Sequence, residues 1–177
     1  QPGSLYAHIR SKDELLVEII DQMSQRFFDA GKAALEDSSR TVVERLNDFI
    51  RCHLRIVIEH RTSATVFFHE WRSLEGESRR LALRQRREYE SMLVGLIQEG
   101  VDRGELRPVD PHLTAIALLG LVNWTYTWYA PEGALSADGL ADMYTHMLID
   151  GIGQPAVPSL SGDGDGWKKT NQQQLRS

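Results

Sequence analysis

The sequence has only one cysteine, Cys52, among its 177 residues. A single thiol forms no internal disulfide, so non-covalent packing must hold the fold, as is typical of proteins from a reducing cytoplasm. No apolar run is long enough to span a membrane: the most apolar stretch, residues 113–122, falls well short of about 20 residues. The N-terminus has no signal-peptide layout. We therefore predict a cytoplasmic protein without a membrane partner.

Sequence patterns that carry catalysis are also missing. The chain contains no Gly-x-Ser-x-Gly, no His-Glu-x-x-His and no glycine-rich phosphate loop. Its six histidines are scattered, and no pair combines with cysteines or carboxylates into a metal site. We predict that the protein is not an enzyme and that it has no cofactor and no metal site.

Positive charge is in deficit as well. Lysine and arginine total 20 residues against 25 aspartates and glutamates, and the net charge is −5. Because affinity for nucleic acids comes largely from neutralising phosphates, most of this chain is not expected to be a nucleic-acid-binding surface. Its length is sufficient for one domain with a stable apolar core.

Helical periodicity, by contrast, is present almost throughout, with few strand signals. The predicted fold class is therefore all-α. We expect helices over residues 11–36, 41–60, 62–74, 78–103, 110–129 and 136 to 151 or 153.

Capping residues mark the predicted helix ends. Ser11 and Thr41 each begin a capping box with a glutamate three positions later, Glu14 or Glu44. Asp110 is an N-cap acceptor. The other boundary signals are Gly104 at a C′ position, Pro111 at a first helical position and Ser136 at an N-cap.

Composition changes after the last predicted helix. Residues 154–177 are rich in proline, serine, glycine and glutamine and have no periodic apolar face, so we predict a disordered tail. The Gly-Asp run at 162–166 lacks the glutamate that would close a calcium-binding EF-hand loop.

The most specific pattern of the chain is at its start. From Gly3 to Leu16 it reads Gly-Ser-Leu-Tyr-Ala-His-Ile-Arg-Ser-Lys-Asp-Glu-Leu-Leu, the end of one helix and the capped start of the next. This resembles the tetracycline-repressor (TetR) family of bacterial transcription regulators, in which the pattern joins the recognition helix to the following helix. The resemblance implies a TetR-like helical ligand-binding and dimerisation domain over residues 11–153, preceded at residues 1–10 by the end of a recognition helix.

The resemblance also implies contacts with DNA. By their places in the motif, Ser4, Tyr6, His8 and Lys12 are expected to contact phosphates or base edges of operator DNA. Family members carry two further helices before the motif, so residues 1–10 are expected to be a helix-turn-helix remnant that does not bind operator DNA alone. The implied function is a ligand-responsive transcription regulator, a repressor that a small effector releases from DNA.

The last two predicted helices are too apolar for one chain to cover. The helix from Asp110 is apolar nearly all round, and the helix from Ser136 has an apolar stripe. A twofold four-helix interface between two copies would cover both, and TetR-like regulators dimerise through these two helices. The alternatives are a monomer covered by a missing segment and a helical module that binds a different protein. The expected homodimer interface residues are Leu113, Leu121, Trp128, Leu140, Met143, Tyr144 and Met147.

Aromatic residues mixed with a few polar ones predict a small-molecule cavity near residues 67–71 and 123–129. Each of these residues has an alternative interpretation as ordinary core. The arginines near residue 84 form either a solvated face or a fork that binds phosphate. The candidate ligand-binding residues are Phe67, Phe68, His69, Trp71, Arg84, Arg87, Asn123, Trp124, Thr127 and Trp128.

One subgroup of the TetR family resembles this chain in the strings 69–74 and 123–133. Its members regulate fatty-acid, aromatic-acid and sterol-ring breakdown and respond to acyl-CoA thioesters. The resemblance implies a small hydrophobic effector, with an acyl-CoA as the candidate. The subgroup commonly has an arginine in the place of Thr127, so the residue that would meet the CoA phosphates is left open.

Overall fold

The computed structural model describes residues 11–130, 132–133 and 135–152. Within these residues it contains α-helices, one 3-10 turn and no strand, which confirms the all-α prediction. The predicted remnant at residues 1–10 and the predicted tail at 154–177 lie outside the described residues. The elements are α1 (Lys12–Leu35), α2 (Val42–Glu59), α3 (Arg61–Glu70), η2 (Trp71–Ser73), α4 (Gly76–Asp102), α5 (Pro111–Trp128) and α6 (Ala137–Ile152).

The capping residues set the helix ends as predicted. The Glu14 N–H donates to Ser11 Oγ at 3.1 Å, and the Ser11 N–H donates to the Glu14 carboxylate at 3.2 Å. Thr41 and Glu44 form the second capping box. Asp110 accepts from a backbone N–H in the first turn of α5 at 2.9 Å. The starts of α1, α2 and α5 are therefore capped by interactions between residues three apart.

The segment between α3 and α4 differs from the prediction. The expected helix over 62–74 ends at Glu70 and continues as the short turn η2. Leu74 then adopts an extended conformation and is 5% exposed, packed with Ile20 of α1 and Ala82 of α4. Burial of this one side chain redirects the backbone, so α4 begins at Gly76, two residues earlier than expected, with a φ of 54°.

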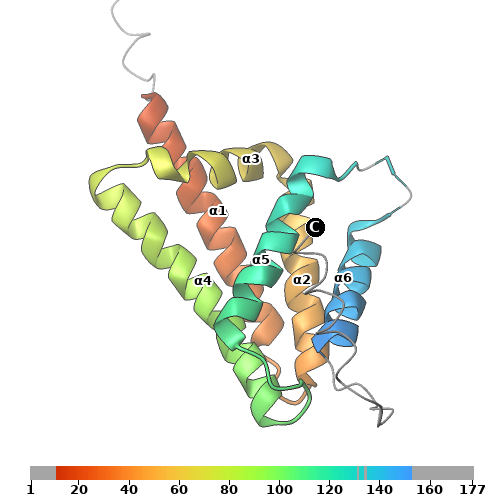
Figure 1. The fold of residues 1–177 in the computed structure, drawn as a ribbon. Helices are drawn as coiled ribbons and strands as arrows, with labels where there is room; N and C mark the ends of the chain where they lie inside the picture. The colour runs from red at the N-terminus through yellow and green to blue at the C-terminus, as the bar shows by residue number, and fades with distance from the viewer. Residues whose placement is uncertain (1–10, 131, 134, 153–177) are drawn as a thin grey trace, which may run out of the picture.

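The helices converge at one end of the molecule and diverge at the other, where α3 lies across the wide end (Figure 1). The first turns of α1 project beyond α3. Helix α2 is central and packs against α1, α4, α5 and α6. No helix within the described ranges has the length and apolarity needed to cross a bilayer.

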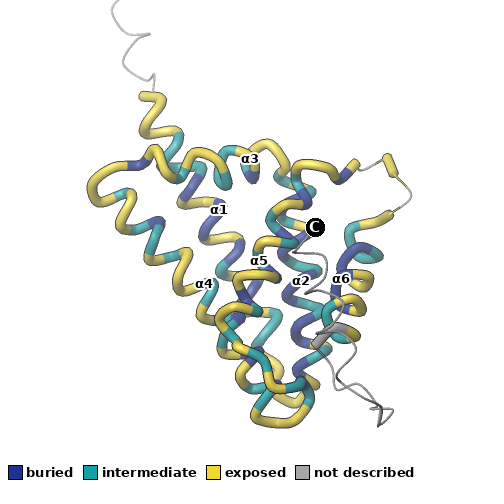
Figure 2. Tube along the Cα trace, in the orientation of Figure 1, coloured by how far each residue is buried: buried dark blue, intermediate teal, exposed yellow. Residues whose placement is uncertain are grey.

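The apolar core follows α2 along its length, as the buried residues in Figure 2 show. Phe49 and Leu46 of α2 are 1% exposed and Ile50 is fully buried. Burying a side chain of this size stabilises the fold by roughly 1.5–3 kcal/mol. The largest core cluster therefore joins α2 to α4, α5 and α6, and two smaller clusters attach α1, α3 and the Leu74 segment.

Two arginines of α2 pair with aspartates of α6. The Arg55 guanidinium donates to both carboxylate oxygens of Asp138, at 2.8 and 2.7 Å. Arg51 donates to Asp142 at 2.7 Å. The two aspartates are one helical turn apart and half or more exposed. They lie beside the buried face of α6, which is formed by Leu140, Ala141, Tyr144 and Thr145.

Gly100 on α4 provides a test of this packing. A methyl group at Gly100 would lie 2.7 Å from Leu106 and 2.9 Å from Val42, both fully buried or nearly so. We therefore expect Gly100→Ala to lower the free energy of unfolding by about 1–3 kcal/mol.

Gly95, on the same helix, is the matched control, because nothing lies within 4 Å of an added Cβ there. Gly95→Ala is expected to raise the free energy of unfolding by about 0.5–1 kcal/mol through helix propensity. Urea unfolding of both variants measures the difference, and equal effects would contradict the close packing at Gly100.

Candidate functional site

A cavity of about 80 Å³ lies between α1, the α3–η2 segment, α4 and α5. Its wall is mainly aromatic and aliphatic, with a few polar groups. The lining residues are Ile20, Ser24, Phe27, Phe67, Phe68, Trp71, Ala82, Gln85, Arg86, Tyr89, Leu119 and Asn123.

Phe27 of α1 is the central aromatic residue of the cavity wall. Its ring stacks on His53 of α2 with the centroids 4.5 Å apart. It also contacts Phe67 at 5.5 Å and Phe68 at 6.1 Å between ring centroids. Such ring contacts contribute about 0.5–1.5 kcal/mol beyond the area they bury. Helix α1 is thus attached to both α2 and α3 through one side chain.

His53 is the central polar residue beside the cavity, and it is 2% exposed. Its Nδ1 shares a hydrogen bond of 2.9 Å with the Tyr89 hydroxyl, and its Nε2 is buried without a partner among the described residues. Burial lowers the pKa of His53 from 6.5 to about 3, and the neighbouring Asn123 side chain opposes the shift. Burial also raises the pKa of Tyr89 well above its ordinary value. Both groups are therefore neutral at physiological pH.

The cavity continues outward past Trp71. A second hollow of about 190 Å³ shares Phe68, Trp71, Arg86 and Asn123 with the cavity. We call this hollow the outer pocket. The remaining lining residues of the outer pocket are Arg72, Gly120, Trp124 and Tyr126.

The structure brings part of the predicted ligand-binding set together. Phe67, Phe68, Trp71 and Asn123 line the cavity, and Trp124 lines the outer pocket. Their contact with a ligand remains a prediction.

The other predicted residues of α3 and α5 lie elsewhere. His69 is exposed and shares a hydrogen bond of 2.6 Å with the Tyr126 hydroxyl. Thr127 is exposed and donates to the Trp124 carbonyl at 2.7 Å. Trp128 is 47% exposed and lines neither hollow. Thr127 and Trp128 lie outside the cavity because successive residues of α5 point to different faces of the helix.

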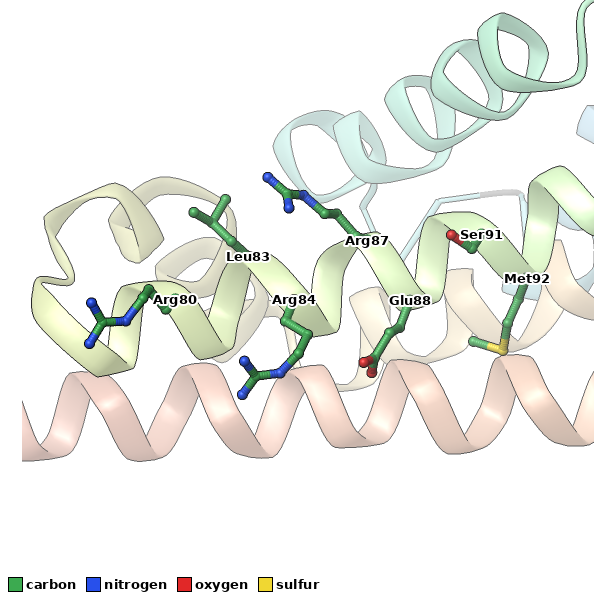
Figure 3. Close-up of a pocket in the computed structure, with 7 residues that line it drawn as sticks. All are labelled: Arg80, Leu83, Arg84, Arg87, Glu88, Ser91 and Met92. Atoms are coloured by element: carbon green, nitrogen blue, oxygen red, sulfur yellow. The ribbon is translucent and has the colours of Figure 1, made fainter.

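Arg84 and Arg87 do not reach the cavity. They line a separate surface groove of about 750 Å³, whose lining residues all belong to α4. Figure 3 shows the two guanidinium groups extending from α4 in different directions. The predicted arginine fork is therefore not formed by this pair, because long side chains at a helix surface can point apart even from positions three residues apart.

Several lining residues were not predicted from the sequence. Ile20, Ser24 and Phe27 belong to α1, whose periodicity indicates core packing and carries no sign of a cavity. One weak feature of the sequence could have indicated that Tyr89 has an inward-facing role: it is the single aromatic residue of the charged helix α4.

Large apolar side chains are exposed on α5 and α6. The exposed fraction is 64% for Leu113, 47% for Trp128, 46% for Met143 and 52% for Met147. Leu121 is partly exposed. Ile116 and Trp124 of α5 are exposed as well, at 46% and 63%, and were not among the predicted interface residues. Single chains rarely expose so many neighbouring apolar groups without a partner.

Leu140 and Tyr144 require a correction. They were predicted to lie between protomers, but they are 0% and 7% exposed within one chain and belong to its core cluster. Both side chains pack in one cluster with buried residues of α2, so they are covered within a single chain. The interface proposed below therefore excludes both residues.

Among the predicted DNA contacts, Lys12 is the first residue of α1 and is exposed. Ser4, Tyr6 and His8 lie outside the described residues.

The comparison with known families agrees with this fold. The profile of the tetracyclin repressor-like, C-terminal domain matches residues 39–152. The chain belongs to this family. It is similar to the HTH-type transcriptional repressor KstR2 of Mycolicibacterium smegmatis, with 27% identity over 161 residues that cover 86% of this chain and 75% of that protein.

Solved structures show the same architecture. PfmR, a TetR family regulator from Thermus thermophilus, matches with a TM-score of 0.75 and 30% identity, covering 82% of this chain and 79% of that one. AibR in complex with isovaleryl coenzyme A and operator DNA matches with a TM-score of 0.71 and 30% identity, covering 81% and 77%. The family resemblance predicted from the first residues is confirmed.

Burial of His53 has a consequence for stability that can be measured. A histidine whose pKa falls from 6.5 to about 3 on folding binds its proton more readily in the unfolded chain. Its contribution is therefore intact above pH 6.5 and is lost as the pH falls toward 3. At pH 5 the loss is about 2 kcal/mol relative to pH 7.

Urea unfolding of the wild type and His53→Phe at pH 7 and pH 5 tests this expectation. Phenylalanine keeps a ring against Phe27 and removes the titrating group. The stability difference between the two pH values should be about 2 kcal/mol smaller in the variant. If the stability difference between pH 7 and pH 5 is the same in both proteins, folding does not lower the pKa of His53.

Proposed function

We propose that this chain is the effector-sensing and dimerisation part of a transcriptional repressor, and that its effector is a small hydrophobic molecule bound in the cavity. An acyl-CoA thioester is the favoured effector class. Three findings support this proposal: the aromatic cavity wall, the likeness to AibR, a protein bound to isovaleryl coenzyme A and operator DNA, and the likeness to a KstR2 repressor.

The observation that carries the proposal is the participation of α1 in the cavity wall. Ile20, Ser24 and Phe27 line the cavity, and the N-terminal turns of the same helix project from the bundle toward the predicted DNA-reading segment (Figure 1). Because these three side chains belong to α1, we expect a ligand that displaces them to displace α1, the helix that follows the predicted DNA-reading segment.

The small volume of the cavity indicates how an effector would change the structure. Its 80 Å³ is well below the roughly 300–1,000 Å³ of typical small-molecule sites. An effector must push the wall outward, and α1 and the α3–η2 segment contribute residues to that wall. In a dimer, a shift of α1 changes the separation of two recognition helices that need half-sites about one turn apart. Effector and operator then oppose each other through a coupling free energy.

The dimer is proposed to form through the exposed apolar residues of α5 and α6. Leu113, Trp128, Met143 and Met147 are expected to lie in its centre, with Leu121 at its edge. A twofold axis would place each helix pair against its own copy as a four-helix interface.

Light scattering combined with size exclusion tests the dimer. Leu113→Glu and Met147→Glu each place a charge in the proposed contact, and we expect the dissociation constant of the dimer to rise at least about tenfold. Leu15→Glu on α1, where leucine is 46% exposed, is the matched control and should leave the dimer intact. A monomeric wild type would instead favour a module that binds a different protein.

Thermal or urea unfolding in the presence of acyl-CoA thioesters tests the effector site. A ligand at 100 times its dissociation constant is expected to stabilise the folded chain by about 2.7 kcal/mol. Ser24→Leu fills the cavity and should abolish this stabilisation. Thr127→Leu, at an exposed position outside the cavity, should retain it. Equal loss in both variants would place the ligand elsewhere.

A further inference from the structure

Two arginines flank Trp71 at the boundary between the cavity and the outer pocket. The guanidinium carbon of Arg72, on η2, lies 4.7 Å from the centroid of the Trp71 ring, and that of Arg86, on α4, lies 5.2 Å from it. Both are within the range of a cation–π interaction. One indole therefore holds two positive charges from different elements.

The two elements are tied together beside this cluster. Arg79 of α4 donates from Nη1 to the Arg72 carbonyl oxygen at 3.2 Å. Leu74, buried between α1 and α4, fixes the chain two residues after Arg72. Arg72 is therefore held near α4 by its backbone, and its side chain does not depend on a salt bridge for its position.

Neither guanidinium is neutralised within the described part of the chain. Most buried or bridging arginines of this acidic protein have a carboxylate partner: Arg45 pairs with Glu99 at 2.8 Å and Arg55 with Asp138 at 2.7 Å. Within the described residues neither guanidinium group takes part in a salt bridge, and the hydrogen bond from Arg79 reaches only the backbone carbonyl of Arg72. Two unpaired positive charges over one ring repel each other, and an anion beside them would remove that repulsion.

The surroundings separate these arginines from the other unpaired ones of α4. Arg84 and Arg87 line an outer groove without an aromatic residue. Arg72 and Arg86 both line the outer pocket, and Arg86 also lines the apolar cavity. Asn123 lines both hollows. An apolar body in the cavity would thus carry its polar end directly to the two guanidinium groups.

We propose that Arg72 and Arg86 form an anion-binding pair that selects effectors with a carboxylate or phosphate group next to their apolar body. A guanidinium over an aromatic ring keeps its N–H donors available, and these donors match the oxygens of either anion. Trp71 positions the pair, and the outer pocket receives the anion. This inference rests on the proposed effector cavity and names the chemical class of its ligand.

Titration calorimetry with three decanoyl compounds tests the proposal on the full chain. Decanoyl-CoA carries phosphates, decanoate carries a carboxylate, and decanol has the same chain without charge. We expect the wild type to bind at least one anionic compound more tightly than decanol. Arg72→Gln and Arg86→Gln should lower the affinity for the anionic compound by about 10- to 100-fold and leave the affinity for decanol unchanged. Arg86→Lys, which retains the charge, should keep part of the preference.

Arg84→Gln and Arg87→Gln are the matched controls on α4 and should bind all three compounds as the wild type does. If Arg72→Gln and Arg86→Gln lose affinity only for decanoyl-CoA, the anion recognised is phosphate. If they lose affinity for decanoate as well, the pair also recognises carboxylates. Both outcomes support the proposal. Equal wild-type affinity for decanol and the anions, or equal losses in the control variants, would overturn it while the effector cavity stands. Binding of none of the three compounds would overturn both.

Discussion

The stack of Phe27 on His53, with the hydrogen bond between His53 and Tyr89, is the contact on which the cavity depends. It joins α1, α2 and α4 at one point. The three rings place aromatic surface on the cavity side and a neutral polar pair behind it. Because burial keeps His53 uncharged, this contact buries no charged group at physiological pH. Helix α1 is therefore held by ring packing, which a ligand in the same space can rearrange.

The same bundle produces two surfaces of opposite character. On α6, Asp138 and Asp142 pair with Arg55 and Arg51 of α2, and large apolar side chains of α5 and α6 are left exposed. At the wide end, between η2 and α4, the aromatic groups point inward and unpaired arginines are left at the edge. We propose that the first surface binds a second copy of the chain and that the second binds an anionic ligand.

Sequence-based prediction was accurate for features that depend on neighbours in the chain. The capping boxes at Ser11 and Thr41 and the N-cap at Asp110 lie where they were expected, since each involves residues three apart. It was less accurate where distant segments meet. Leu74 ended the predicted third helix early because its burial against α1 and α4 outweighed local helix propensity.

The amino-acid sequence by itself determined the helices, the all-α class and the family, because periodicity, capping and a short motif are local properties. Only the tertiary structure decided which residues share a site. It placed Phe27 and Tyr89 in the cavity, turned Leu140 and Tyr144 into the core, and set Arg86 beside Trp71. Those outcomes depend on how each helix is rotated about its axis, and that rotation is fixed by packing and salt bridges between helices far apart in the chain.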